Sequence, residues 1–230
     1  MTKIRYLILP IATTLLIWVL NTRIGTLPPL GKFLDPFHGY LALVGSDDLK
    51  RLHMDTPQLE SPVTVIFDSL RIPHIFAEND HDLYFVQGYI MASERLWQME
   101  FQTHAAGGRM SEIIGEKALG YDRFQRRVGM KFGAENSLNA ILKDQLLSPM
   151  VDSFTEGINA YISSLSKDQY PLEYKILDYS PELWTPLKTS LLLKYMAWML
   201  TGRNTELTYT RMWNKMGRDV VEELFPIYPW

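Results

Sequence analysis

The sequence DLYFVQGYIMASERLWQME, residues 82–100, predicts the central part of a long amphipathic helix. Its apolar residues recur at intervals of three, four and seven, which predicts one buried stripe made of Leu83, Val86, Ile90, Trp97 and Phe101. We expect Asp80 to cap this helix, with Asp82 in its first turn, where the helix dipole favours an acid. Gly107 and Gly108 are predicted to end it, because glycine readily adopts a positive φ.

A β-hairpin is predicted immediately before this helix. Two β-rich runs, residues 63–67 and 72–76, flank the turn at residues 68–71. Pro73 lacks an N–H, so the second run is predicted to be an edge strand or to pair on one side only. A short helix is predicted around residues 48–53.

More helices are predicted after the central one, at residues 109–114, 132–143, 149–164, 186–201 and 206–216. The first of these is expected to start at Ser111 and Glu112, because serine caps helices and glutamate suits the first turn. The chain has 230 residues, of which 47% are hydrophobic, so it is long enough to bury a substantial core. A hairpin followed by helices indicates an α+β fold.

Composition and motifs exclude several classes of function. The net charge is −3 and the basic residues are scattered, so no nucleic-acid partner is expected. The absence of cysteine excludes disulfides, thiolate metal sites and a cysteine nucleophile. The sequence contains no H-E-x-x-H, G-x-S-x-G, Walker or dinucleotide motif, and we expect no organic cofactor. The five histidines have no metal-binding spacing and are expected to be exposed or hydrogen-bonded.

The N-terminus resembles an export signal. Lys3 and Arg5 precede the apolar run YLILPIATTLLIWVL at residues 6–20. This run is shorter than the about 20 apolar residues of a full membrane span, and no small-x-small cleavage site follows it. Residues 1–25 are therefore predicted to be either a signal peptide or an uncleaved signal-anchor. The protein is expected in the periplasm or anchored to the outer face of the inner membrane. The proline-rich residues 26–61 are predicted to be an extended connector.

Two regions allow more than one interpretation. Glu94 and Arg95 are either a solvated pair or include a partly buried arginine that holds loops together. Residues 194–206, KYMAWMLTGRNTE, place soft methionine side chains at the end of a helix. Such side chains suit a pocket for an apolar ligand, although the sequence alone favours plain core packing.

Residues 72–115, IPHIFAENDHDLYFVQGYIMASERLWQMEFQTHAAGGRMSEIIG, carry a family resemblance. Further matching segments follow in order: DRF at 122–124, EGINAYI at 156–162, YPLEYKIL at 170–177, PELWTP at 181–186 and LFPIYP at 224–229. Together they resemble the penicillin acylase (penicillin amidase) family of N-terminal-nucleophile hydrolases. The resemblance implies that residues 62–230 form the α-chain region of an αββα fold, which is incomplete without the β chain.

The resemblance also implies an activity and a partner. Family members are precursors that cut themselves, and the serine that begins the β chain is the nucleophile. No catalytic residue is therefore assigned in this chain, which is expected to be inactive without its β chain. The implied substrate is an amide between an apolar acyl group and an amine, of the penicillin or N-acyl homoserine lactone type. Met196, Met199 and Leu200 are implied to contact the acyl group. Glu206 is implied to bind a structural calcium ion shared with the β chain.

Two positions depart from the family pattern. Arg71 stands where the family usually has glycine, so the hairpin turn is expected to differ in shape. Leu187 and Lys188 replace a common acidic pair, which is expected to weaken the capping of the following helix. The alternative interpretation is a truncated, non-catalytic relic or a membrane-anchored binding module. Expressed alone, the chain is expected to expose apolar patches and to aggregate or stay partly molten.

Overall fold

The computed structural model describes residues 2–23, 29–35, 39, 51–54, 56–201 and 206–226. The strands in these ranges are β1 (Arg51–Met54), β2 (Val63–Phe67) and β3 (Pro73–Phe76). The longer helices are α1 (Thr2–Asn21), α3 (Asp80–Gly107), α5 (Leu119–Val128), α6 (Met130–Ile141), α7 (Leu147–Ser164), α9 (Pro186–Leu200) and α10 (Glu206–Met216). The short helices are α2 (Gly31–Leu34), α4 (Ser111–Ile114), α8 (Leu172–Leu177) and α11 (Arg218–Leu224). The chain divides into two compact units, Met1–Tyr195 and Met196–Trp230.

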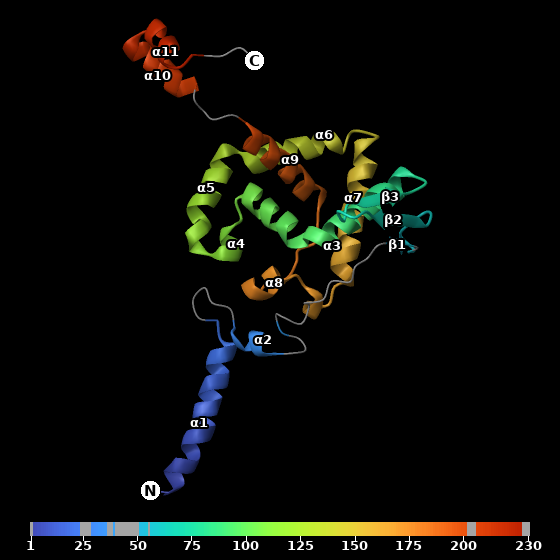
Figure 1. Cartoon of the computed structure of the whole chain (residues 1–230), viewed down its shortest axis with the longest axis vertical. Coiled ribbons are helices and arrows are strands. Elements are labelled where there is room, and N and C mark those ends of the chain that lie inside the picture. The colour runs from blue at the N-terminus through green and yellow to red at the C-terminus, as the bar shows by residue number, and fades with distance from the viewer. Residues whose placement is uncertain are drawn as a thin grey trace. The chain divides into compact units, whose positions relative to one another are not determined.

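The three strands form an antiparallel sheet in the order β1-β2-β3 (Figure 1). The predicted hairpin is confirmed, and β3, which contains Pro73, lies at the edge of the sheet as predicted. The Asp68 carboxylate shapes the turn, because it accepts the backbone N–H groups of Leu70 and Ile72 at 2.8 and 2.9 Å. Arg71 itself adopts the left-handed conformation, with φ 61°, so the turn keeps a geometry that glycine would adopt more easily.

The helix predicted around residues 48–53 is wrong for the part that the structure describes. Residues 51–54 are strand β1, in which Met54 is paired with Val63 and Leu52 with Val65. Val63 and Val65 are fully buried. Pairing with β2 therefore decides the conformation of this segment, and tertiary contacts override its weak local preference.

Helix α3 begins and ends close to the predicted residues. Its N-cap is Asn79 rather than Asp80, because the Asn79 side chain accepts the N–H of Asp82 at 2.8 Å. Its end is confirmed at Gly108, which has φ 65°. The Asp82 carboxylate is completely buried and accepts the backbone N–H groups of Glu60 and Ser61, both at 2.9 Å. These bonds fix the segment before β2 to the start of α3.

The predicted buried stripe of α3 holds only up to a kink at Arg95. The backbone of Arg95 is not helical, with φ −144° and ψ 26°. Before the kink, Val86 and Ile90 are buried as predicted, against β2 and the end of β1, whereas Leu83 is only partly buried. After the kink, Leu96 and Met99 enter the core, whereas the predicted Trp97 and Phe101 are only partly buried. The kink rotates the second half of the helix, which a single helical period does not anticipate.

Helices α3 and α7 form the most extensive helix–helix contact, and two glycines allow it. A Cβ atom added to Gly157 of α7 would lie 1.8 Å from the carbonyl oxygen of Phe85 on α3. A Cβ atom added to Gly88 would lie 2.2 Å from the carbonyl oxygen of Phe154. The backbones therefore approach closely at this crossing, where Ile158 is fully buried.

The other predicted helices are present with shifted ends. Helices α6, α7 and α9 overlap the three predicted ranges to within two residues at each end, and α10 has the predicted bounds. Helix α4 starts after Met110, and the Ser111 hydroxyl does not cap it but donates to Asp122 at 2.5 Å. The sequence did not predict α5, α8 and α11, nor α2, which lies within the predicted extended connector. Helix α5 was missed because its inward side carries the buried polar residues Asp122 and Gln125, which break the apolar period.

The N-terminal apolar run forms most of α1, a helix of 20 residues that includes Pro10. Its side chains from Ile8 to Trp18 include seven large hydrophobic ones that are exposed. None of the helices described by the structure meets the combined length and apolarity that a membrane span requires. That this segment is a signal peptide or an uncleaved signal-anchor stays a prediction.

Candidate functional site

The residues implied to contact the acyl group lie at the end of α9. Met196, Met199 and Leu200 have exposed fractions of 60%, 62% and 78%. The competing interpretation was that these side chains pack in the core. Within the described part of the chain they do not. Their role in binding an acyl group stays a prediction.

Glu206, the implied calcium ligand, is the first residue of α10 and is exposed. It lines a hollow of about 260 Å³ in the second unit, together with side chains of α10 and α11 that are mostly apolar: Tyr209, Thr210, Trp213, Val221, Glu222 and Phe225. Calcium takes six to eight oxygen ligands, and among the described residues Glu206 belongs to no cluster of three metal-binding side chains. The described residues therefore do not form a calcium site by themselves.

A buried polar network lies where α9 begins, and the sequence did not predict it. Its centre is Glu100 on α3, with an exposed fraction of 1%. The Tyr174 hydroxyl donates to Glu100 Oε2 at 2.5 Å, and the backbone N–H of Glu182 lies 3.3 Å from the same oxygen. Burial raises the pKa of Glu100 and also raises the pKa of Tyr174. The hydrogen bond from Tyr174 partly offsets the effect of burial on the Glu100 pKa.

Glu182 extends this network toward two cations. Arg109 donates to both carboxylate oxygens of Glu182, at 2.7 and 3.2 Å, and Lys188 Nζ lies 3.2 Å from Oε2. The hydrogen bonds from Arg109, together with Lys188, lower the pKa of Glu182 to about 2. Lys188 is buried, and its ammonium also lies 5.7 Å from the centre of the Trp184 ring. The lysine that departs from the family pattern thus joins the start of α9 to the loop before it.

The network contains the one cluster of three metal-binding side chains found among the described residues. Oxygen or nitrogen atoms of Glu100, His104 and Glu182 lie within 4.8 Å of one another. However, Arg109 and Lys188 already neutralise Glu182, and Tyr174 occupies Glu100. A metal ion would compete with all three groups, so the cluster is an ion-pair network rather than a metal centre. The i, i+4 spacing of Glu100 and His104 was its only signal in the sequence.

His104 agrees with the expectation for the histidines. It is buried, and its Nδ1 lies 3.0 Å from the carbonyl oxygen of Glu100. For the pair Glu94 and Arg95, the structure favours the solvated alternative, because both side chains are exposed and Arg95 donates to Gln98.

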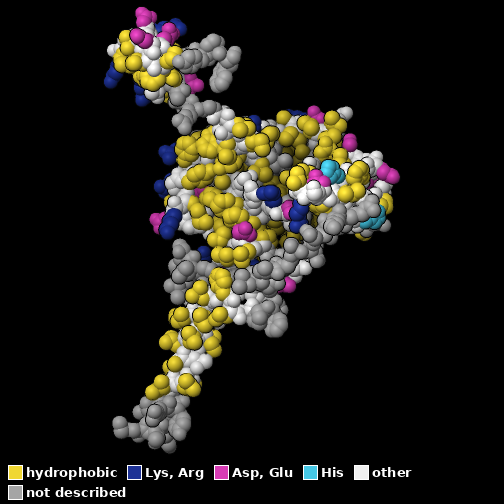
Figure 2. Space-filling model, in the orientation of Figure 1, with side chains coloured by type: hydrophobic (Ala, Val, Ile, Leu, Met, Phe, Trp, Pro, Cys, Tyr) yellow, Lys and Arg dark blue, Asp and Glu magenta, His cyan; other side chains and the backbone are white. Residues whose placement is uncertain are grey.

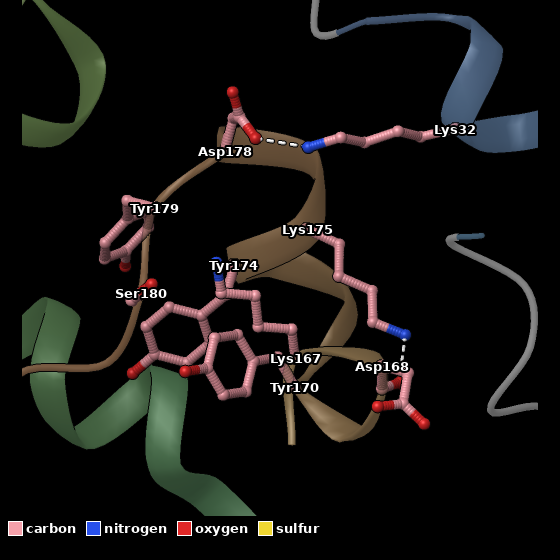
Figure 3. A pocket seen from close by; sticks show the side chains of 9 residues that line it. All are labelled: Lys32, Lys167, Asp168, Tyr170, Tyr174, Lys175, Asp178, Tyr179 and Ser180. Carbon is pink, nitrogen blue, oxygen red and sulfur yellow. Dashed lines mark hydrogen bonds and ion pairs between the residues drawn. The ribbon is translucent and has the colours of Figure 1, made fainter. Parts of the chain in front are cut away.

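A second hollow, of about 460 Å³, lies beside α8 (Figure 3). Figure 3 shows Lys32 of α2 reaching Asp178, and the Lys175 amine reaching the backbone of Asp168; the two contacts measure 2.5 and 2.6 Å. Burial lowers the pKa of Lys175. Two of the cations that line this hollow, Lys32 and Lys175, are already bound by oxygen atoms. The hollow therefore offers little unpaired charge for a ligand.

Large hydrophobic side chains are exposed on one face of the first unit. Figure 2 shows them gathered where α4, α5 and α9 lie. Within the first unit, which ends at Tyr195, the exposed large hydrophobic residues of these helices and of α6 are Ile114, Leu119, Phe124, Val128, Phe132 and Leu193. Monomeric proteins rarely expose a wide apolar face without a partner. The predicted exposure of apolar surface is therefore present, while aggregation of the isolated chain stays a prediction.

Comparisons with known proteins agree on one family. The family model described as penicillin amidase matches residues 62–230. Acyl-homoserine lactone acylase QuiP of Pseudomonas syringae pv. tomato is 31% identical over 172 residues, which cover 74% of this chain and 20% of that protein. Penicillin acylase 2 proenzyme of Pseudomonas sp. (strain SE83) is 30% identical over 168 residues, covering 73% of this chain and 20% of that protein. The chain thus spans about a fifth of the length of these relatives.

A solved structure supports the same fold. The thermostable penicillin G acylase from Alcaligenes faecalis superposes with a TM-score of 0.62 and 24% sequence identity. The match covers 73% of this chain and 93% of the solved chain. The predicted helix-rich α+β fold is therefore confirmed.

Proposed function

Because the chain belongs to the penicillin amidase family, we propose that it forms the α-chain part of a self-processing amidohydrolase. The enzyme cleaves the amide between an apolar acyl group and an amine. The observation that carries this proposal is the family match across residues 62–230. The relatives named above act, by their names, on acyl-homoserine lactones and penicillins, and both compounds contain such an amide.

The nucleophile of the proposed enzyme is the serine that begins the β chain. Its free α-amine serves as the base that activates the hydroxyl, and donors on the β chain stabilise the oxyanion. The α chain alone is then inactive, and the β chain of the same precursor is its partner. The exposed apolar face over α4, α5 and α9 supports this proposal, because it provides a surface for another chain to cover.

The proposed contribution of the α chain to substrate binding is the end of α9. Met196, Met199 and Leu200 form one wall for the acyl group, and the β chain supplies the others. Their exposure leaves them available to a ligand. Burying an apolar acyl group against them would contribute about 0.8 kcal/mol for each methylene removed from water.

Two further features of the family are proposals for this chain. Glu206 supplies one ligand of a structural calcium ion, whose remaining oxygen ligands come from the β chain. The segment before residue 26 directs export to the periplasm or anchors the protein to the outer face of the inner membrane, in agreement with the exposed apolar side chains of α1.

The test is an intact-mass measurement of the product of the complete gene, purified from the exported fraction, followed by assays with acyl amides. Two co-purifying chains, one beginning with serine, and hydrolysis of an acyl-homoserine lactone or a penicillin are expected. A single unprocessed chain without hydrolysis would contradict the proposal and support the relic or binding module.

The acyl wall is tested with matched methionines. Met196→Ala is expected to raise KM for long acyl chains more than for short ones. Met216→Ala is the control, because Met216 is another exposed methionine, at the end of α10. If both variants change KM equally, Met196 does not contact the acyl group.

A further inference from the structure

A third hollow, of about 500 Å³, lies between the end of α3 and the start of α9, and we call it the basic hollow. Four of its lining side chains are cations, namely Arg109, Arg126, Lys131 and Lys188, and one is an acid, Glu182. Its volume falls in the range of about 300–1,000 Å³ that small-molecule sites occupy. It is distinct from the end of α9, where the acyl wall is proposed.

The charges of the basic hollow are not balanced within it. Glu182 is already bound by Arg109 and Lys188, and Arg109 also pairs with Glu112, so these two cations are compensated. In the part of the chain that the structure describes, Arg126 forms no ion pair within 4.0 Å. Arg126 helps to lower the pKa of Asp122, but the Asp122 carboxylate already accepts hydrogen bonds from Met110 and Ser111.

The Arg126 guanidinium is bound by the backbone on one side only. Arg126 Nε donates to the carbonyl oxygen of Gly108 at 3.0 Å, which leaves its two terminal nitrogens to other acceptors. Lys131 is the second cation within reach of a ligand, because its side chain is 61% exposed and its 3.7 Å contact with Glu135 is a weak surface ion pair. A planar guanidinium and an ammonium that line the same hollow suit an anionic head group.

The remaining wall of the hollow is apolar. Leu183, Leu187 and Leu191 line it, and Leu183 is 60% exposed although it faces a hollow. A ligand that combines an anionic head with an apolar tail would neutralise Arg126 and cover Leu183 together. Neither a bare anion nor a neutral apolar compound would satisfy both parts of the surface.

We propose that the basic hollow binds a carboxylate that carries an apolar tail, with its head at Arg126 and Lys131 and its tail along the three leucines. This site is separate from the proposed acyl wall. It requires that the proposed β chain leaves the hollow open, so failure of decanoate to bind the complete product would overturn it. The probe is decanoate, titrated calorimetrically below its micelle concentration into the product of the complete gene. Decanol supplies the tail without the charge, and inorganic phosphate supplies a charge without the tail.

Decanoate is expected to bind, and decanol and phosphate at least tenfold more weakly. Arg126→Gln is expected to weaken decanoate binding at least tenfold. Arg127→Gln is the matched control, because Arg127 is an exposed arginine of the same helix that does not line the hollow. Its variant should bind as the unaltered protein does. Equal binding by the two variants, or equal binding of decanol, would overturn the proposal.

A second substitution tests the proposal independently, in case Arg126→Gln changes the fold. Leu183→Asp places a negative charge at an exposed position of the hollow and is expected to abolish decanoate binding while the thermal midpoint changes little. Leu183→Asn has a similar size without the charge, so it should retain part of the affinity. If Leu183→Asp binds decanoate normally, the carboxylate does not occupy this hollow.

Discussion

Replacing Gly157 with alanine is expected to damage the contact between α3 and α7 severely. The added Cβ would lie 1.8 Å from the Phe85 carbonyl oxygen and 2.7 Å from its carbon, whereas ordinary contacts begin at 3.4 Å. The atoms must therefore separate by about 1.6 Å, the difference between these two distances. The obstacle is backbone, which has no alternative rotamer, so the two helices themselves must move apart.

The magnitude follows from two opposing effects. Overpacking of a close-packed core costs about 1–3 kcal/mol, and contact with a rigid backbone places this substitution at the upper end. Alanine gains about 0.5–1 kcal/mol over glycine inside a helix. We expect Gly157→Ala to lower the free energy of unfolding by about 2 kcal/mol or more.

Gly133→Ala is the control for this prediction. Gly133 is also inside a helix, but its added Cβ would meet only Lys194 Cδ, at 3.9 Å. This variant should gain the helical preference of alanine and become slightly more stable. Urea unfolding followed by tryptophan fluorescence compares the two, since Trp97 and Trp184 pack against the core that contains Ile158. If Gly157→Ala unfolds at the same urea concentration as Gly133→Ala, the close crossing of α3 and α7 is incorrect.

Three other predictions concern the hairpin turn and the buried network. Arg71→Gly is expected to raise the free energy of unfolding by about 0.5–1 kcal/mol, because Arg71 has φ 61°, which glycine adopts with less strain. Arg71→Ala keeps the strain and should show no gain in urea unfolding. Tyr174→Phe removes the hydroxyl that donates to the buried Glu100 at 2.5 Å, so it should lower the free energy of unfolding by about 1.5–3 kcal/mol. The control is Tyr170→Phe, a neighbour in the same hollow, which should lower it less in the same urea assay. The pKa of Glu182 is lowered from 4.5 to about 2, so its ion pairs stabilise the fold above pH 4.5 and this contribution is lost as the pH falls toward 2. Over that pH window, Glu182→Gln should therefore lose less stability than the unaltered protein. The difference should be about 1 kcal/mol, because solvent screens the charges of a partly exposed side chain. If the thermal midpoints of both proteins fall in parallel with pH, this assignment is contradicted.

Local sequence predicted those elements whose signals are contained within a few residues. The hairpin before α3 follows from two β-rich runs around a turn, and the end of α3 follows from Gly108. The bounds of α10 also follow from its apolar period and the polar break before it. The family resemblance rests on the same continuous segments, and the comparisons agree with it.

Other elements carry weak local signals. Helix α5 turns the polar side chains Asp122 and Gln125 inward, so apolar periodicity does not mark its buried side. Helices α8 and α11 have only six and seven residues, too few to display a helical period clearly.

The buried network was decided by tertiary structure alone. Glu100 and Glu182 are 82 positions apart, and each would be read from the sequence as a solvated acid. Folding removes Glu100 from water and places Arg109 and Lys188 against Glu182, so the partners that make burial tolerable exist only after the chain is folded. Sequence thus determined the local hairpin and helices and the family of this protein. The kink at Arg95, the buried charges and the basic hollow depend on contacts between distant residues, whose energies no local pattern contains.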